Sequence, residues 1–303
     1  MPIWSDDEIL SAFSRVRCWE RDGQRAPHKP LLLLMALARV QRGDDPWMAY
    51  EAIEIPLRTL LREFGPPRRS QHPEYPFWWL KSDNGLWTIS DLDRLEGIER
   101  TRKNVPPTIL RAEHARASLS PEIVAALRQR PALVNRIAVL LLDENFPASL
   151  HEDILDAVGM PFVDERLGER AVRDPAFREA ILRAYERRCA VCGYDGRLGS
   201  SDLGLEAAHV KWHAAGGPDT VDNGLALCVF HHKSFDRGAI GLDDDRCILV
   251  SQDVNGQSHV DELILRFSGQ PLRVPQEGQP PPAPAFITWH RSEVFRPPPR
   301  AVA

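Results

Sequence analysis

The stretch CAVCGYDGRLGSSDLGLEAAHVKWHAAGGPDTVDNGLALCVFHH, residues 189–232, places three cysteines and several histidines at the spacing of a metal site. Two residues separate Cys189 from Cys192, and two residues separate Cys228 from His231. Two such pairs, each on a tight turn, supply the four ligands of a tetrahedral structural zinc site. We therefore predict a zinc ion held by three cysteines and one histidine.

Three further polar residues, which the zinc does not need, lie within or directly after this framework: His209, Asn223 and His232. We expect a strand at LEAAHVKW, a loop at GGPDTVDNG, and a helix beginning within residues 225–234, which together make a ββα unit. Hydrolysis of a phosphodiester needs a base that deprotonates water and a divalent cation that neutralises the phosphate. Neutral imidazole suits both tasks, because its pKa lies near about 6.5.

These requirements assign a role to each residue. His209 is the predicted general base, Asn223 fixes the loop by bonding to backbone or to His209, and His232 binds the catalytic cation. The alternative is a zinc-stapled binding module without catalysis.

The intervals of this cluster resemble those of the HNH endonucleases of McrA-like restriction enzymes, and so does FDRG at residues 235–238. The resemblance implies a metal-dependent nuclease that carries structural Zn²⁺ and uses Mg²⁺ or Mn²⁺ for catalysis. It also implies a zinc-stapled ββα-metal fold for this part of the chain.

Two positions depart from that family. The fourth zinc ligand is His231, where the family usually has a cysteine. Ala208 precedes the general base, where an aspartate or histidine often binds the catalytic metal. Alternate residues of a strand share a face, so Glu206 is our substitute ligand, with His213 as the second candidate.

The first half of the sequence reads as mostly helical. Ser5 and Glu8 form a capping box, Leu31 to Gln41 predicts a buried helix after Pro30, and Ala52 to Phe64 predicts another helix. LKSDNGLWTIS, residues 80–90, predicts a β-hairpin. We therefore expect an α+β protein: a helical domain with a small hairpin, followed by the zinc-stapled ββα domain.

Two short segments of this half are candidates for binding. Arg25, His28 and Lys29 lie just before the buried helix, where free N–H groups favour an anion, although a basic surface turn is the alternative. Tyr75 and Pro76 lie in a segment that we expect not to be regular helix, and their rings would form one face of a shallow cavity. We expect the neighbouring Trp79 and Trp87 to pack in the core.

RAPHKPLLLL (25–34), HPEYPFWWL (72–80) and the helical region up to Gly159 resemble the sulfur-binding domain of phosphorothioation-dependent type IV restriction endonucleases. The resemblance implies that the protein binds double-stranded DNA in which sulfur replaces a non-bridging phosphate oxygen, and cleaves nearby. Sulfur is weakly hydrated, so an apolar cavity favours it over oxygen. An Arg or Lys within residues 68–81 is expected to read base edges. The residues implied to bind DNA or sulfur are Arg25, His28, Lys29, Pro30, Tyr75, Pro76, Phe77 and Trp78.

Length and composition agree with a two-domain globular protein. The 303 residues are 43% hydrophobic and 27% charged, and the net charge of −5 requires local basic patches for DNA binding. Five cysteines, three of them at ligand spacing, indicate a reducing compartment. Without a signal-peptide start or an apolar run of about 20 residues, we expect a bacterial cytoplasmic location and no membrane partner.

The expected domains are a sulfur-binding domain at residues 1–162, a linker at 163–173, and an HNH domain at 174–303 that ends in an extended, proline-rich tail. Two other functions stay open: an HNH nuclease that reads another DNA mark, such as a methylated base, and a non-catalytic zinc-containing DNA-binding regulator. A homodimer that cuts both strands also stays open.

Overall fold

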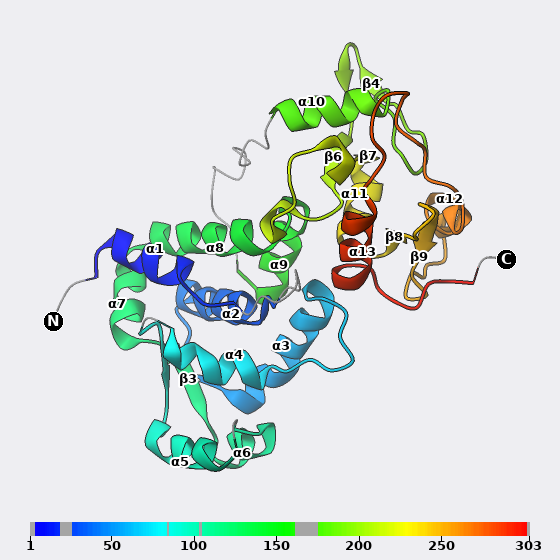
Figure 1. Cartoon of the computed structure of the whole chain (residues 1–303). Helices are drawn as coiled ribbons and strands as arrows, with labels where there is room; N and C mark the ends of the chain where they lie inside the picture. Colours follow the sequence, from blue (N-terminus) through cyan, green and yellow to red (C-terminus); the bar gives the residue numbers. More distant parts are fainter. Residues whose placement is uncertain (1–3, 19–25, 84, 103–104, 161–174, 302–303) are drawn as a thin grey trace. The chain divides into compact units, whose positions relative to one another are not determined.

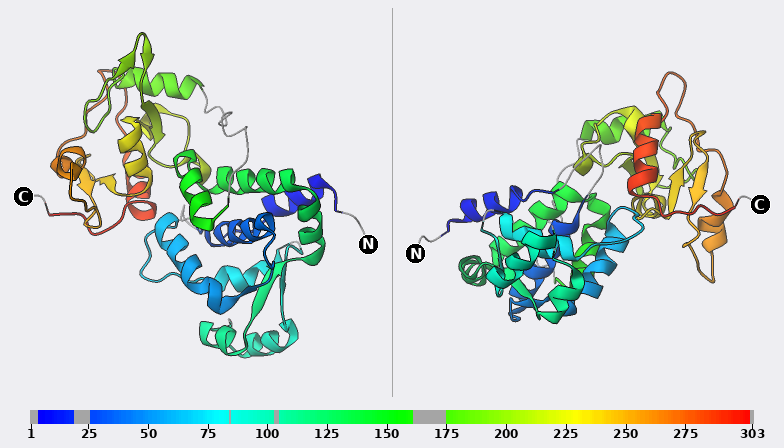
Figure 2. Two further views of the ribbon diagram at one scale, coloured as in Figure 1. Left: turned by 180° about the vertical axis from the view of Figure 1, so that it is seen from behind. Right: turned by 60° about the horizontal axis from the view of Figure 1, so that its bottom comes forward.

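The computed structural model describes residues 4–18, 26–83, 85–102, 105–160 and 175–301. Its contacts divide the chain into two units (Figures 1 and 2). Unit 1 comprises Met1–Asn145 and His151–Asp164, and unit 2 comprises Phe146–Leu150 and Glu165–Ala303. The predicted linker at 163–173 lies outside the described residues, as does Arg25.

Unit 1 is helical with one small sheet. Its helices and strands are α1 (Asp6–Ser14), α2 (His28–Arg42), β1 (Met48–Ala49), α3 (Tyr50–Phe64), α4 (Glu74–Trp79), β2 (Trp87–Ile89), α5 (Leu92–Arg102), α6 (Pro107–Ala112), β3 (Arg116–Leu119), α7 (Pro121–Gln129), α8 (Pro131–Asn145) and α9 (His151–Val158).

Helix α2 is the centre of unit 1. It contacts α3, α4, α7, α8 and α9, and residues 31–34, all leucine, have no exposed surface. A helix that is apolar on nearly all sides belongs in a core, so the prediction of a buried helix is confirmed. Gly43 ends it with φ of +77°, a left-handed conformation that glycine adopts without strain. The helix starts at His28, which places His28 and Lys29 in its first turn.

The small sheet of unit 1 differs from the predicted hairpin. Residues 80–82 form a 3₁₀ turn, and β2 pairs with β3, Trp87 opposite Leu119. Strand β3 also pairs with β1, which gives the order β1-β3-β2. The hairpin prediction is wrong because the partner of β2 comes from a distant part of the chain.

The conformation around Tyr75 and Pro76 also differs from the prediction. Tyr75 and Pro76 lie within this helix, where we expected no regular helix. Pro76 is its third residue, and the first four N–H groups of a helix have no intrahelical acceptor, so proline costs no hydrogen bond there.

Unit 2 is a mixed α/β unit built from short elements. They are α10 (Pro175–Ala184), β4 (Arg197–Leu198), β5 (Ser201–Asp202), β6 (Leu205–His209), β7 (Gly224–Cys228), α11 (Val229–Asp236), β8 (Ile240–Leu242), β9 (Ile248–Val250), α12 (Val260–Leu263) and α13 (Pro284–Glu293).

Strands β6 and β7 and helix α11 form the expected ββα unit. The strands are antiparallel, with His209 opposite Gly224. The helix starts at Val229, because the apolar residues 224–228 form a fully buried strand. Helix α10 packs on both strands, and a Cβ at Gly224 would lie 2.1 Å from the Cδ1 atom of Ile181. Only glycine at this position lets α10 approach.

The last part of the chain is more ordered than predicted. Strands β8 and β9 form an antiparallel pair, with Ile240 opposite Val250. The proline-rich tail, however, is not extended throughout: α13 packs on β8 and buries Ile287, Trp289 and His290. Pro284 lies in the first turn of α13, where proline favours a helix. The α+β class and its order, helical unit before ββα unit, are confirmed. Among the described helices, none has the length and apolar character needed to span a membrane.

Candidate functional site

The predicted zinc ligands converge. Ligand atoms of Cys189, Cys192, Cys228 and His231 all lie within 4.8 Å of one another. The Nδ1 atom of His231 lies 3.2 Å from Sγ of Cys228 and 3.7 Å from Sγ of Cys189. Around a tetrahedral zinc with Zn–S bonds of about 2.3 Å, neighbouring ligand atoms lie roughly 3.5 Å apart, so these residues fit the ion.

The second nitrogen of His231 shows how the ring is held. Nε2 lies 2.8 Å from the carbonyl oxygen of Leu263, to which it donates. A hydrogen bond of this kind leaves Nδ1 as the ligand nitrogen. Cys228 is the N-cap of α11 and His231 lies in its first turn, so the cluster joins the loop after α10 to the start of α11.

His209 lies at the end of β6 and is held from two directions. Its ring stacks on Phe177 of α10, with centroids 4.2 Å apart and planes at 13°. Its Nε2 atom lies 2.7 Å from Oδ1 of Asp219. A carboxylate that accepts from Nε2–H keeps the hydrogen on this nitrogen and makes Nδ1 the basic one. Asp219 was not among the predicted residues, because spacing alone does not distinguish it from Asp222 in the same loop.

Asn223 has no exposed surface and holds the loop between β6 and β7. Its Oδ1 accepts from the backbone N–H of Lys211 at 2.8 Å. Its Nδ2 donates to the carbonyl oxygens of Lys211 at 3.0 Å and Pro218 at 2.9 Å. These bonds go to backbone, which was one of the two partners expected for this side chain.

His232, on α11, faces the carboxylate of Glu206, on β6. Its Nδ1 atom lies 2.7 Å from Oε2 of Glu206. Adjacent ligands of an octahedral Mg²⁺ with bonds of about 2.1 Å lie roughly 3 Å apart, so this pair fits a divalent cation. Ala208 is fully buried, and the carboxylate beside His232 comes from Glu206. His213 lies near His209 instead, with ring centroids 5.9 Å apart.

The start of α2 carries less positive charge than the sequence predicts. Burial, with smaller contributions from nearby His72 and Arg68, lowers the pKa of His28 to about 4. This imidazole is therefore neutral near pH 7 and can offer a hydrogen bond but no positive charge. The ammonium group of Lys29 pairs with the buried carboxylate of Asp83, which offsets part of its charge.

Helix α4 divides the predicted aromatic residues into two groups. Phe77 and Trp78 are 0% and 1% exposed, so they pack in the core, and we no longer expect them to contact DNA. Pro30 and Pro76 are buried as well. Tyr75 is 40% exposed and Trp79 37%, and residues four apart share a helix face.

The prediction that Trp79 lies in the core is wrong, because this side chain is exposed. Trp87 is buried, as predicted. The ring of His72 stacks on Tyr75 with centroids 4.7 Å apart. We call Tyr75, Trp79 and His72 the α4 aromatic face. The spacing of four residues between Tyr75 and Trp79 is the sequence signal for this shared helix face.

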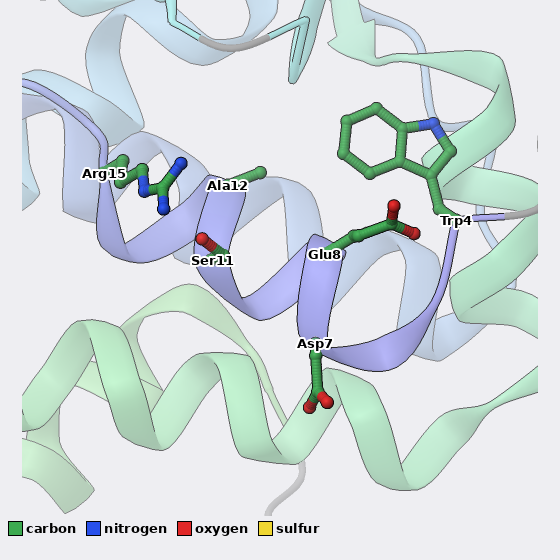
Figure 3. Close-up of a pocket in the computed structure, with 6 residues that line it drawn as sticks. All are labelled: Trp4, Asp7, Glu8, Ser11, Ala12 and Arg15. Carbon is green, nitrogen blue, oxygen red and sulfur yellow. The ribbon is translucent and has the colours of Figure 1, made fainter.

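A surface hollow of about 700 Å³ lies along α1, away from these residues in the sequence (Figure 3). Its lining residues are Trp4, Asp7, Glu8, Ser11, Ala12 and Arg15. Glu8 caps its own helix by accepting from the backbone N–H of Ser5 at 2.8 Å. Two carboxylates in the lining disfavour a phosphate ligand.

Comparisons with known proteins match both halves of the chain. The family model described as "ScoMcrA-like, DNA sulfur-binding domain" matches residues 6–162, and that described as "HNH endonuclease" matches residues 189–243. Both resemblances drawn from the sequence are confirmed. No curated protein matches the chain.

Among solved structures, the chain is similar to the "Sulfur binding domain of ScoMcrA complexed with phosphorothioated DNA" at 24% identity, with a TM-score of 0.44, covering 50% of this chain and 94% of that chain. It is similar to the "Sulfur binding domain of SprMcrA complexed with phosphorothioated DNA" at 20% identity, with a TM-score of 0.41, covering 52% and 95%. A third is the "Structure of the Type IV phosphorothioation-dependent restriction endonuclease ScoMcrA", at 23% identity and a TM-score of 0.40, covering 54% of this chain and 34% of that chain.

The sulfur-binding model alone covers about half of the sequence. This protein therefore belongs to the family with a ScoMcrA-like DNA sulfur-binding domain, to which it joins an HNH endonuclease domain.

Proposed function

We propose that this protein is a restriction endonuclease that binds phosphorothioate-modified double-stranded DNA and hydrolyses phosphodiester bonds near the modification. One observation carries the proposal: a DNA sulfur-binding domain and an HNH endonuclease domain lie in the same chain. The first domain, residues 1–162, selects the DNA. The second, residues 174–303, cuts it.

The α4 aromatic face is the proposed contact for sulfur. Tyr75 and Trp79 offer exposed apolar surface, on which a polarisable, weakly hydrated sulfur loses less hydration than a phosphate oxygen. His28 donates a hydrogen bond as a neutral imidazole, and Lys29 supplies the positive charge. We also retain Arg25, which lies outside the described residues, as a phosphate contact.

The HNH residues divide the chemistry among themselves. His209 accepts the proton of the attacking water through Nδ1, while Asp219 holds the hydrogen on Nε2. Asn223 keeps the loop closed. Glu206 and His232 would hold a divalent cation, Mg²⁺ or Mn²⁺, which would supply positive charge at the scissile phosphate. Zn²⁺ on the Cys189 cluster has a structural role only.

A digest of two plasmids tests the sulfur claim. We expect the full chain with Mg²⁺ or Mn²⁺ to cut a plasmid from a phosphorothioating host and to spare the same plasmid without the modification. A third plasmid, methylated but free of sulfur, serves as the comparison mark. Equal cutting of the modified and unmodified plasmids refutes sulfur recognition, and cutting of the methylated plasmid alone supports a different mark.

The His209→Ala variant tests catalysis separately from binding. We expect it to bind phosphorothioated duplex as the wild type does and to lose cleavage, because the base is absent and the DNA-reading unit is unchanged. His259→Ala is the matched control, since this exposed histidine lies in the same unit, near Glu262 and away from the ββα residues in sequence. Cleavage retained by His209→Ala would refute the assignment of the base.

We also propose that two copies associate through the nuclease domain. Leu203, Val229, Phe230 and Leu263 are each at least 41% exposed, and they help to line a hollow of about 490 Å³ beside the zinc cluster. Exposed apolar patches of this kind often mark interfaces, and two HNH sites are needed to cut both strands together. Light scattering after gel filtration measures the mass, and a Phe230→Glu variant should shift a dimer to a monomer.

A further inference from the structure

The metal-binding histidine of the proposed site is itself held by a buried pair, Asp236 and Trp212. The Nε2 atom of His232 lies 3.1 Å from Oδ2 of Asp236, one helical turn further along α11. The indole Nε1–H of Trp212 donates to the other oxygen, Oδ1, at 3.0 Å. All three side chains are at most 3% exposed.

The contact with Asp236 determines which nitrogen of His232 can bind a cation. A histidine nitrogen binds a cation through its lone pair, so Nδ1 of His232 can serve beside Glu206 only when the ring hydrogen is on Nε2. Without a cation, Nδ1 faces Glu206 at 2.7 Å and Nε2 faces Asp236 at 3.1 Å, and both carboxylates accept hydrogen bonds and donate none. When a cation takes the place of the hydrogen between Nδ1 and Glu206, Asp236 keeps the remaining ring hydrogen on Nε2. Trp212 fixes the plane of that carboxylate.

We propose that Asp236 and Trp212 are positioning residues that direct Nδ1 of His232 toward the catalytic cation. The inference rests on the proposed nuclease function, because it concerns the same cation site. It adds two residues that neither touch the cation nor take part in proton transfer. Partners of this kind, which orient a ligand from behind, typically change metal affinity about 10- to 100-fold.

The Asp236→Asn substitution tests whether Asp236 controls the position of the ring hydrogen of His232. Asparagine has one acceptor oxygen, while the wild-type carboxylate faces the N–H of Trp212 at Oδ1 and both His232 and the hydroxyl of Ser149 at Oδ2. The hydroxyl of Ser149 can donate or accept, so the two N–H groups compete for the amide oxygen. If the oxygen faces Trp212, the NH₂ group faces Nε2 and drives the ring hydrogen to Nδ1, where it blocks the cation. Replacing Trp212 with phenylalanine removes the competing donor, so the amide oxygen can turn to His232.

The expected results follow for Mn²⁺ titrated into the zinc-loaded full chain without DNA, with free Mn²⁺ measured by electron paramagnetic resonance. Asp236→Asn weakens Mn²⁺ binding by about 10- to 100-fold. Trp212→Phe causes a smaller loss. The double variant binds Mn²⁺ more tightly than Asp236→Asn alone, which a loss of folding does not produce.

Asp202→Asn is the matched control, because Asp202 is a similarly covered carboxylate of the same unit that pairs with Arg187. It should bind Mn²⁺ like the wild type. Nitrogen-15 NMR of histidine-labelled protein with Mg²⁺ gives an independent readout: Nε2 of His232 carries the hydrogen in the wild type, and Nδ1 carries it in Asp236→Asn.

Three results would each overturn the inference: unchanged Mn²⁺ affinity in Asp236→Asn, no recovery in the double variant, or no saturable Mn²⁺ binding by the wild type. Failure of the proposed function is distinguishable. A chain that binds Mn²⁺ as described but does not cut phosphorothioated DNA refutes the function and leaves the role of Asp236 standing.

Discussion

The contact between His209 and Asp219 predicts how much one carboxylate contributes to catalysis. Asp219→Asn keeps the size of the side chain but replaces the acceptor that holds the hydrogen on Nε2 of His209. The atoms lie 2.7 Å apart, and the side chains of His209 and Asp219 are 13% and 35% exposed. The ring keeps its stacking partner, Phe177, so the variant changes the hydrogen bond and leaves the position of the ring supported.

The expected size of the effect follows from this partial exposure. A hydrogen bond to a charged group contributes about 1.5 to 3 kcal/mol, and the exposure of Asp219 places it near the lower end. About 1.4 kcal/mol corresponds to tenfold in rate. We therefore expect the single-turnover rate constant of cleavage to fall about tenfold with DNA affinity unchanged, because the bond matters when the base takes up a proton.

Single-turnover cleavage of a phosphorothioated duplex measures this change. Asp222→Asn, in the same loop, is the control and should cleave at the wild-type rate. Thermal unfolding and Mn²⁺ affinity should be the same for Asp219→Asn and wild type, which separates this role from folding and from cation binding. A wild-type rate for Asp219→Asn would refute the reasoning, and so would an equal loss in the control.

Three further predictions concern other parts of the chain. Cys228→Ser should release zinc, as measured by metal analysis, and should destabilise the nuclease unit, because structural zinc contributes on the order of 10 kcal/mol in small domains. His28, with its pKa lowered from 6.5 to about 4, makes the wild type lose stability as the pH falls from 6.5 towards 4, since the unfolded chain takes up the proton first. In urea unfolding, His28→Gln should therefore show a weaker acid destabilisation than wild type, and an identical pH dependence would contradict the buried neutral imidazole. Tyr75→Ala and Trp79→Ala should each weaken binding to phosphorothioated duplex by about 1 kcal/mol, with little change for the unmodified duplex in fluorescence anisotropy.

Several features could be predicted because they depend on residues close in sequence. The buried helix α2 follows from an apolar run that covers nearly all its sides, and the ββα unit follows from a strand, a glycine-rich loop and a second apolar strand. The zinc ligands were predicted because each pair lies within one turn of backbone. Glu206 was expected beside His232 from strand alternation, and the two side chains do meet.

Other features depended on packing between distant segments. Strand β2 pairs with β3 rather than with the preceding residues, and α4 is a helix in spite of Pro76. The tail forms α13 because its apolar residues pack on β8, and the ring of His290 stacks on Phe235 of α11 with centroids 3.6 Å apart. No local pattern encodes such pairings, since they form only when separate segments bury apolar surface together.

The sequence by itself determined which residues are the candidates for the chemistry of this protein: the four proposed zinc ligands, the proposed base, the asparagine, the histidine on α11 and its carboxylate partner. Ligand chemistry and short-range spacing are properties of the chain and need no tertiary information. Only the tertiary structure decided which neighbours control them. Asp219 is an ordinary acidic residue in the sequence, and Asp236 appears there only as part of the FDRG segment, without a role. They gain their significance from lying 2.7 Å from His209 and 3.1 Å from His232. Burial likewise separated Tyr75 and Trp79, which are exposed, from Phe77 and Trp78, because the face that a helical residue presents is set by what packs against the helix.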